Sequence, residues 1–127
     1  MHHLQNLIIW EKSMELAKST YNLTINLPET EKFGLMTQMR RSAISIPSNI
    51  AEGAGRSSDK EFKHFLGIAN GSVFELQTQL LLAKNLSLIQ KMEVDPLIDI
   101  CTELQKMIYS FRNNLNNKIE HKNQSKF

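Results

Sequence analysis

The stretch from Gln38 to Arg56, QMRRSAISIPSNIAEGAGR, constrains the fold more than any other part of the chain. On a helix of about 3.6 residues per turn, its apolar side chains form one face: Met39, Ala43, Ile46, Ile50 and Ala54. The opposite side is a polar and ionic stripe: Gln38, Arg41, Ser45, Asn49, Glu52 and Arg56. Between the two lies a third, mostly apolar strip: Arg40, Ile44, Pro47 and Ala51. Because a solvated helix needs only one apolar face, this pattern predicts a helix packed within an assembly.

The composition favours an all-α fold in one domain. The 127 residues include only five glycines and three prolines, and Leu, Ile and Met supply most of the apolar content. A chain of this length can bury a single core. We expect one domain over residues 1–127, ordered from about 7 to 119. The net charge of +2 is mildly basic, so charge alone does not predict a nucleic-acid-binding protein.

Cysteine usage and hydropathy indicate a cytoplasmic protein without cofactors. Cys101 is the only cysteine, so no intramolecular disulfide can form, and no Cys/His spacing suits zinc. No apolar run approaches the roughly 18 residues of a membrane span. The N-terminus has no basic segment followed by a long apolar one. We therefore expect no metal, no cofactor, no membrane association and a reducing compartment.

The first half of the chain predicts two helices. The first runs over about 7–27, with Asn6 as its cap and one side facing the core: Trp10, Met14, Ala17, Tyr21 and Ile25. Pro28 ends it. The second begins near Leu35 and contains Pro47, which predicts a kink over about 43–47 where serine hydroxyls take up freed carbonyls. Ser42 and Ser45 are the expected donors.

The second half predicts two more helices. Ser58 and Glu61 form a capping box before a periodic apolar run: Phe62, Leu66, Ala69, Val73, Leu76, Leu80 and Ala83. Asp95 and Pro96 are expected to begin the last helix, whose seam runs from Leu97 to Leu115, and the lysine-rich tail is expected to fray. Short connections between four helices predict an antiparallel up-down-up-down four-helix bundle.

Two surfaces are expected to lie between subunits. The helix that follows Ser58 carries a second strip away from its core side, in which two glycines four residues apart permit close backbone approach. Together with the extra strip of the preceding helix, this predicts an oligomer interface: Ile44, Ala51, Gly67, Gly71, Phe74 and Leu81. We expect a homo-oligomer.

No pattern of residues indicates catalysis. Cys101 lies on the seam of the last helix and is interpreted as a small buried hydrophobe, and His64 as a surface side chain. The carboxylates of Glu52 and Glu75 are interpreted as members of a structural ion-pair network with Arg56 and Arg41, respectively. The chain is therefore expected not to be an enzyme.

The densest basic group surrounds the start of the third predicted helix. Arg40, Arg56, Lys60 and Lys63 are the candidates for binding phosphates, because cations gathered at one place attract a polyanion. Arg56, Lys60 and Lys63 should meet at one end of the bundle. The alternative is that Arg41 and Arg56 are neutralised by Glu52 and Glu75 and that the lysines are merely solvated.

Two quoted runs carry a resemblance to a known family. The string QMRRSAISIPSNIAEGAGR, followed by EFKHFLGIANGSVFELQTQL, resembles the bacterial four-helix bundle proteins called 23S rRNA intervening-sequence proteins. The resemblance spans about 7–119, with Ser42 and Asn70 as mild departures. It implies a homopentameric ring. It also implies similarity to the accessory protein of diversity-generating retroelements, a basic pentamer that binds nucleic acid and a reverse transcriptase.

Two functions from different classes follow. The first is an oligomeric module that binds structured RNA or other nucleic acid through basic residues that ring symmetry brings together. The second is a protein-binding scaffold or adaptor with no nucleic-acid role. Salt-dependent binding to RNA distinguishes them, because only phosphate contacts release counterions.

Overall fold

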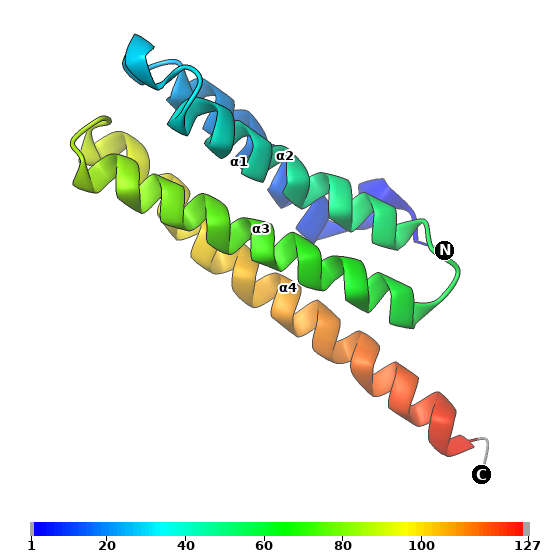
Figure 1. The fold of residues 1–127 in the computed structure, drawn as a ribbon. Coiled ribbons are helices and arrows are strands. Elements are labelled where there is room, and N and C mark those ends of the chain that lie inside the picture. Colours follow the sequence, from blue (N-terminus) through cyan, green and yellow to red (C-terminus); the bar gives the residue numbers. More distant parts are fainter. Residues whose placement is uncertain (1, 126–127) are drawn as a thin grey trace.

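Four antiparallel helices form the bundle that the sequence predicts (Figure 1). The structure, a computed structural model, describes residues 2–125, with side chains to Asn123. The helices are α1 (Ile8–Thr24), α2 (Leu35–Ala54), α3 (Asp59–Asn85) and α4 (Lys91–Ser125), with short 3-10 turns η1 (Leu4–Asn6) and η2 (Glu29–Glu31). Each helix packs against the next in the chain and α1 also packs against α4, so α1 and α3 are diagonal.

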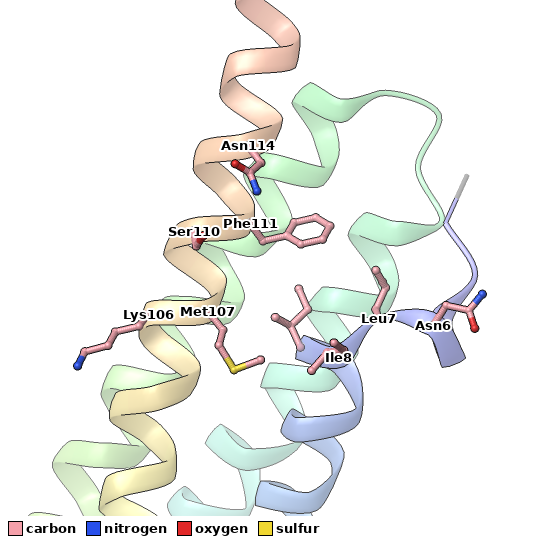
Figure 2. A pocket seen from close by; sticks show the side chains of 9 residues that line it. Asn6, Leu7, Ile8, Lys106, Met107, Ser110, Phe111 and Asn114 are labelled. Carbon is pink, nitrogen blue, oxygen red and sulfur yellow. The ribbon is translucent and has the colours of Figure 1, made fainter.

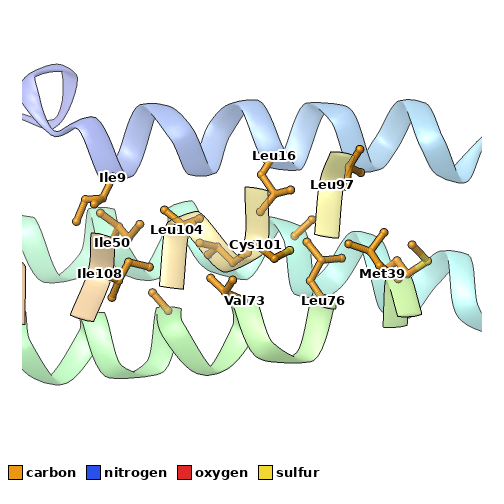
Figure 3. Close-up of a cluster of buried hydrophobic side chains, with 14 of the residues drawn as sticks. Ile9, Leu16, Met39, Ile50, Val73, Leu76, Leu97, Cys101, Leu104 and Ile108 are labelled. Carbon is orange, nitrogen blue, oxygen red and sulfur yellow. The ribbon is translucent and has the colours of Figure 1, made fainter. Parts of the chain in front are cut away.

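A continuous apolar core fills the space between the helices (Figure 3). Leu16, Met39, Leu76 and Leu104 are fully buried, each from a different helix. Cys101 lies among them, as predicted, with none of its surface exposed. The core stripes predicted for α2, α3 and α4 are thereby confirmed.

The predicted core side of α1 is wrong in part. Met14 and Ile25 are 45% and 68% exposed, and the core instead receives Ile9, Leu16 and Leu23. Three polar side chains complete that buried stripe, which hides its periodicity in the sequence: Ser13, Thr20 and Thr24. The Thr20 hydroxyl donates to the Leu16 carbonyl at 2.8 Å, so it is buried without an unpaired donor.

Local chemistry explains the helix boundaries. The Ser58 side chain accepts a hydrogen bond from the Glu61 amide at 3.1 Å, which confirms the predicted cap of α3. The predicted Asn6 cap is wrong, because α1 begins at Ile8 after Leu7, with no side-chain cap. α2 is helical throughout Leu35–Ala54, with Pro47 buried inside it.

The serine assigned to relieve Pro47 has another partner. The Ser45 hydroxyl lies 2.8 Å from that of Ser72 on α3, so it joins two helices and does not cap the carbonyl that Pro47 frees. Asn49 adds to the same contact, because its side-chain amide donates to Ser45 Oγ at 3.0 Å. The polar stripe of α2 therefore serves in part as an internal seam against α3.

The predicted start of the last helix is wrong. α4 begins at Lys91 and includes Pro96, and Asp95 pairs with Lys84 of α3 at 2.7 Å and does not act as a cap. The helix continues to Ser125, beyond the predicted fraying near 119, and extends past the start of α3 (Figure 1). An ionic contact between Lys122 and Asp59, 3.9 Å long, ties this extension to α3.

Candidate nucleic-acid interface

The antiparallel topology gathers basic residues at one end of the bundle. This end holds the C-terminus of α2, the N-terminus of α3 and the last turns of α4 (Figure 1). We call it the basic end, defined by Arg56, Lys60, Lys63, Arg112, Lys118 and Lys122. Four carboxylates lie among these six cations: Glu52, Asp59, Glu61 and Glu120. The basic end therefore carries an excess of positive charge, which attracts polyanions.

Close packing holds α2 and α3 together at the basic end. Gly53 is buried, and a Cβ atom there would come within 2.8 Å of both Phe62 Cδ1 and Phe65 Cβ. The missing side chain is what allows α2 to approach α3 at the turn between them. Arg56 and Lys60 consequently project from a closely packed turn.

Arg56 is partly neutralised, as one of the alternatives from the sequence anticipates. Its guanidinium Nη2 lies 2.6 Å from Glu52 Oε1, which is the predicted pair, and its Nε lies 3.9 Å from Glu61 Oε2. The guanidinium also stands over the ring of Phe65, 5.0 Å from its centroid. Arg56 is therefore held in place, and much of its charge is compensated locally.

Lys60 and Lys63 keep their charges available. Lys60 is exposed, and Lys63 Nζ donates to Asn116 Oδ1 at 2.8 Å. Over residues 2–125 neither lysine pairs with a carboxylate. An ammonium group has three donors, so Lys63 has two left for a phosphate.

Sequence reasoning missed Arg112. Its Nε donates to the Lys63 carbonyl at 3.2 Å, which brings it to the basic end although 49 residues separate the two. A carbonyl does not neutralise a guanidinium, and within the described chain no carboxylate pairs with Arg112. No sequence signal distinguishes Arg112 from the other polar residues of α4, because only packing between helices places it here.

The structure places Arg40 away from the basic end, and its described residues do not show the predicted pairing of Arg41 with Glu75. Arg40 lies near the other end of α2, sixteen residues or roughly 24 Å from Arg56, so it does not join the basic end. Its Nε donates to Thr24 Oγ1 at 2.9 Å, and its guanidinium stands 4.6 Å from the centroid of the Tyr21 ring. Arg41 and Glu75 are both exposed and form no ion pair in the described chain, because they project to solvent and not into the α2–α3 seam.

The predicted interface residues differ in exposure. Ile44, Phe74 and Leu81 are 46%, 53% and 41% exposed, while Ala51 is half-buried. Gly67 has an intramolecular role, because a Cβ atom there would lie 3.2 Å from Arg112 Nη2. Gly71 is open, with nothing within 4 Å of such an atom.

A cleft of about 500 Å³ lies between the start of α1 and α4 (Figure 2). Leu7, Ile8 and Met107 line its interior, and Lys106 points away from it. Lys106 is the only titratable residue among the nine that line it, so the cleft has no acid–base pair. Across residues 2–125 no cluster of three or more His, Cys, Asp or Glu could hold a metal ion.

The described residues offer neither a reactive thiol nor a helix that could span a membrane. Burial raises the pKa of the Cys101 thiol to about 12, so its reactive thiolate is suppressed. Among the described helices, none combines the length and the apolar character that crossing a membrane requires.

The comparison with known families identifies the chain. A family model described as 23S rRNA-intervening sequence protein matches residues 5–110. The chain belongs to this family. The chain also has a structural neighbour described as a protein with unknown function from the S23 ribosomal protein family of Bacteroides thetaiotaomicron. The two superpose with a TM-score of 0.77 at 28% identity, over 83% of this chain and 98% of the neighbour. No curated protein matches the sequence.

Proposed function

We propose that this member of the family is a non-enzymatic, homo-oligomeric module that binds RNA through its basic end. The observation that carries the proposal is the meeting of Lys60, Lys63 and Arg112 from two helices, with no carboxylate paired to any of them in the described chain. A closed ring multiplies such a cluster by the number of subunits and focuses its potential on one rim. A small charge per chain then becomes a phosphate-binding surface.

The arrangement of exposed apolar residues supports a ring. Ile44 lies beside the side of α2 that faces α1, since Arg40, one turn before it, contacts α1. Phe74 lies beside the side of α3 that faces α4, since Gln77, three residues on, hydrogen-bonds to Thr102 of α4 at 2.8 Å. In a four-helix bundle the α1/α2 and α3/α4 surfaces are opposite. Two different surfaces on opposite sides of the bundle suit a head-to-tail contact between copies, and such contacts can close into a ring. The family resemblance implies that the ring has five subunits.

Aspartate variants test this head-to-tail assembly. Ile44→Asp and Phe74→Asp should each break the assembly, because a charge buried in an apolar contact is strongly unfavourable. When the two single variants are mixed, each supplies the intact surface that the other lacks, so dimers of one variant chain with the other should form. Native mass spectrometry measures both results. Retention of the parent's mass by the single variants would place the interface elsewhere.

A second experiment tests RNA binding. Lys60→Glu with Lys63→Glu should lower the affinity for RNA about tenfold or more at low salt without altering the oligomer, because it removes two phosphate contacts and adds repulsion. The matched control, Lys32→Glu with Lys91→Glu, makes the same change in net charge at exposed positions near the opposite end. Fluorescence anisotropy with labelled RNA, titrated with salt from about 50 to 200 mM, measures both.

The alternative function is a protein-binding adaptor, which the exposed apolar residues Phe74 and Leu81 favour. Absence of RNA binding by the parent protein at low salt would contradict the proposed function and leave the adaptor in its place. Equal loss of affinity in the control variant would assign binding to overall charge and not to the basic end.

A further inference from the structure

A small cleft between α3 and α4 adjoins the cations of the basic end. It has a volume of about 180 Å³ and is lined by Lys63, Tyr109, Arg112, Asn113 and Asn116. The lining combines two cations, two amide side chains and one aromatic ring. Binding sites for single-stranded nucleic acid use this combination, because cations meet phosphates while aromatic rings stack on bases.

Tyr109 presents its ring to solvent. The side chain is 67% exposed, and among the described residues its ring makes no contact with another ring or with a cation. The other tyrosine, Tyr21, is 36% exposed and is covered by the Arg40 guanidinium. Of the two tyrosines, Tyr109 is thus the one whose ring face the chain itself leaves open.

Two glycines leave part of the α3 side of the cleft without side chains. The hydrogen bonds from Lys63 to Asn116 and from Gln105 to Gln77 join α3 to α4 on either side of Tyr109, so Tyr109 lies opposite the part of α3 between Lys63 and Gln77. Gly71 has no side chain, and open space surrounds the position that a Cβ atom would take. Gly67 leaves room for the Arg112 guanidinium beside α3. At neither of these two positions does α3 carry a side chain that could cover the Tyr109 ring.

The polar groups of the cleft have free capacity. Lys63 uses one of its three donors on Asn116, and Arg112 uses one of its five on the Lys63 carbonyl, so about six donors remain between them for phosphate oxygens. Asn113 is exposed, and its amide can both donate to and accept from the edge of a base. One cleft therefore holds a group for each part of a nucleotide: cations for the phosphate, the Asn113 amide for the base edge and the Tyr109 ring for the base face.

We propose that this cleft binds an unpaired nucleotide, with its base stacked on Tyr109 and its phosphates on Lys63 and Arg112. The inference rests on the proposed RNA-binding function and adds its substrate class. A paired base is stacked between its neighbours and hides both faces, so a duplex can reach the cations but not the Tyr109 ring. The chain should therefore prefer single strands over duplexes.

The test uses the full chain and three labelled probes: an unstructured RNA of about 12 nucleotides, the same RNA paired with its complement, and single-stranded DNA of the same sequence. Tyr109→Ala should weaken binding of the single-stranded RNA about tenfold and leave duplex binding unchanged, because only stacking is lost. Tyr109→Phe should bind like the parent. Tyr21→Ala, the matched control, should leave all affinities unchanged.

Each result has a defined meaning. Equal affinity of the parent for duplex and single-stranded RNA, or unchanged single-strand binding by Tyr109→Ala, overturns the inference while the proposed function stands. Failure of every probe to bind at low salt overturns the proposed function itself. A changed mass of Tyr109→Ala in native mass spectrometry would show a contact between copies, near Phe74, and would also overturn the inference. Tight binding of the DNA probe extends the site to unpaired nucleotides of either kind, whereas weak binding restricts it to RNA.

Discussion

Replacing Phe62 with alanine should lower the free energy of unfolding by about 3–5 kcal/mol, the usual cost of removing a buried aromatic side chain. Phe62 is only 1% exposed and lies at the basic end, where its ring centroid is 5.3 Å from that of Phe111 and 4.9 Å from that of His2. Its Cδ1 atom also occupies the space that Gly53 leaves open. The variant loses contacts with α2, α4 and the N-terminal segment together, so the cavity cannot collapse easily.

Urea unfolding followed by circular dichroism measures this loss, at one protein concentration because the subunit association proposed above would add to stability. Phe33→Ala is the matched control, since Phe33 is 89% exposed in the α1–α2 connection and its replacement should cost less than about 0.5 kcal/mol. A loss below about 1 kcal/mol for Phe62→Ala would contradict the packing described at this end of the bundle. Phe62→Leu should fall between the two.

The second large effect is a loss of stability at alkaline pH that originates at Cys101. Burial raises the pKa of this thiol from 9.0 to about 12, so the folded protein keeps the proton over a range in which the unfolded chain releases it. The unfolded state then binds fewer protons, so the free energy of unfolding falls as pH rises, by about 1.4 kcal/mol per pH unit between pH 9 and 12. Below pH 9 both states are protonated and the full stability is present.

Cys101→Ala isolates this effect from other groups that titrate in the same range. The variant should be less stable than the parent near neutral pH because of the small cavity, but its stability should fall less steeply above pH 9, so the two curves converge. Parallel curves would mean that the thiol has an ordinary pKa in the folded protein. A thiol reagent at pH 8 gives an independent measurement, because Cys101 should react only after the chain unfolds.

Much of the fold follows from local sequence signals. The Ser58 cap acts over three residues, and the stripe from Phe62 to Ala83 repeats at helical spacing, so both are visible without knowledge of any partner. The predicted α1 stripe is wrong because Ser13 and Thr20 are polar, and polar residues do not indicate a core position. Both are buried nevertheless, because their hydroxyls donate to carbonyls of their own helix. The extension of α4 was missed because its last turns are polar and resemble a frayed tail.

For the candidate site, the sequence by itself determined that Lys60 and Lys63 lie one turn apart at the start of a helix and that Arg56 lies just before it, and therefore that the three share an end of the bundle. Only the tertiary structure decided that Arg112 and Tyr109 join them and that Arg40 packs on α1 at the other end. The physical reason is the separation along the chain over which each interaction acts. Helix periodicity and capping act within a few residues, whereas the register of α3 against α4 depends on contacts such as Lys63 with Asn116, across 53 residues of chain.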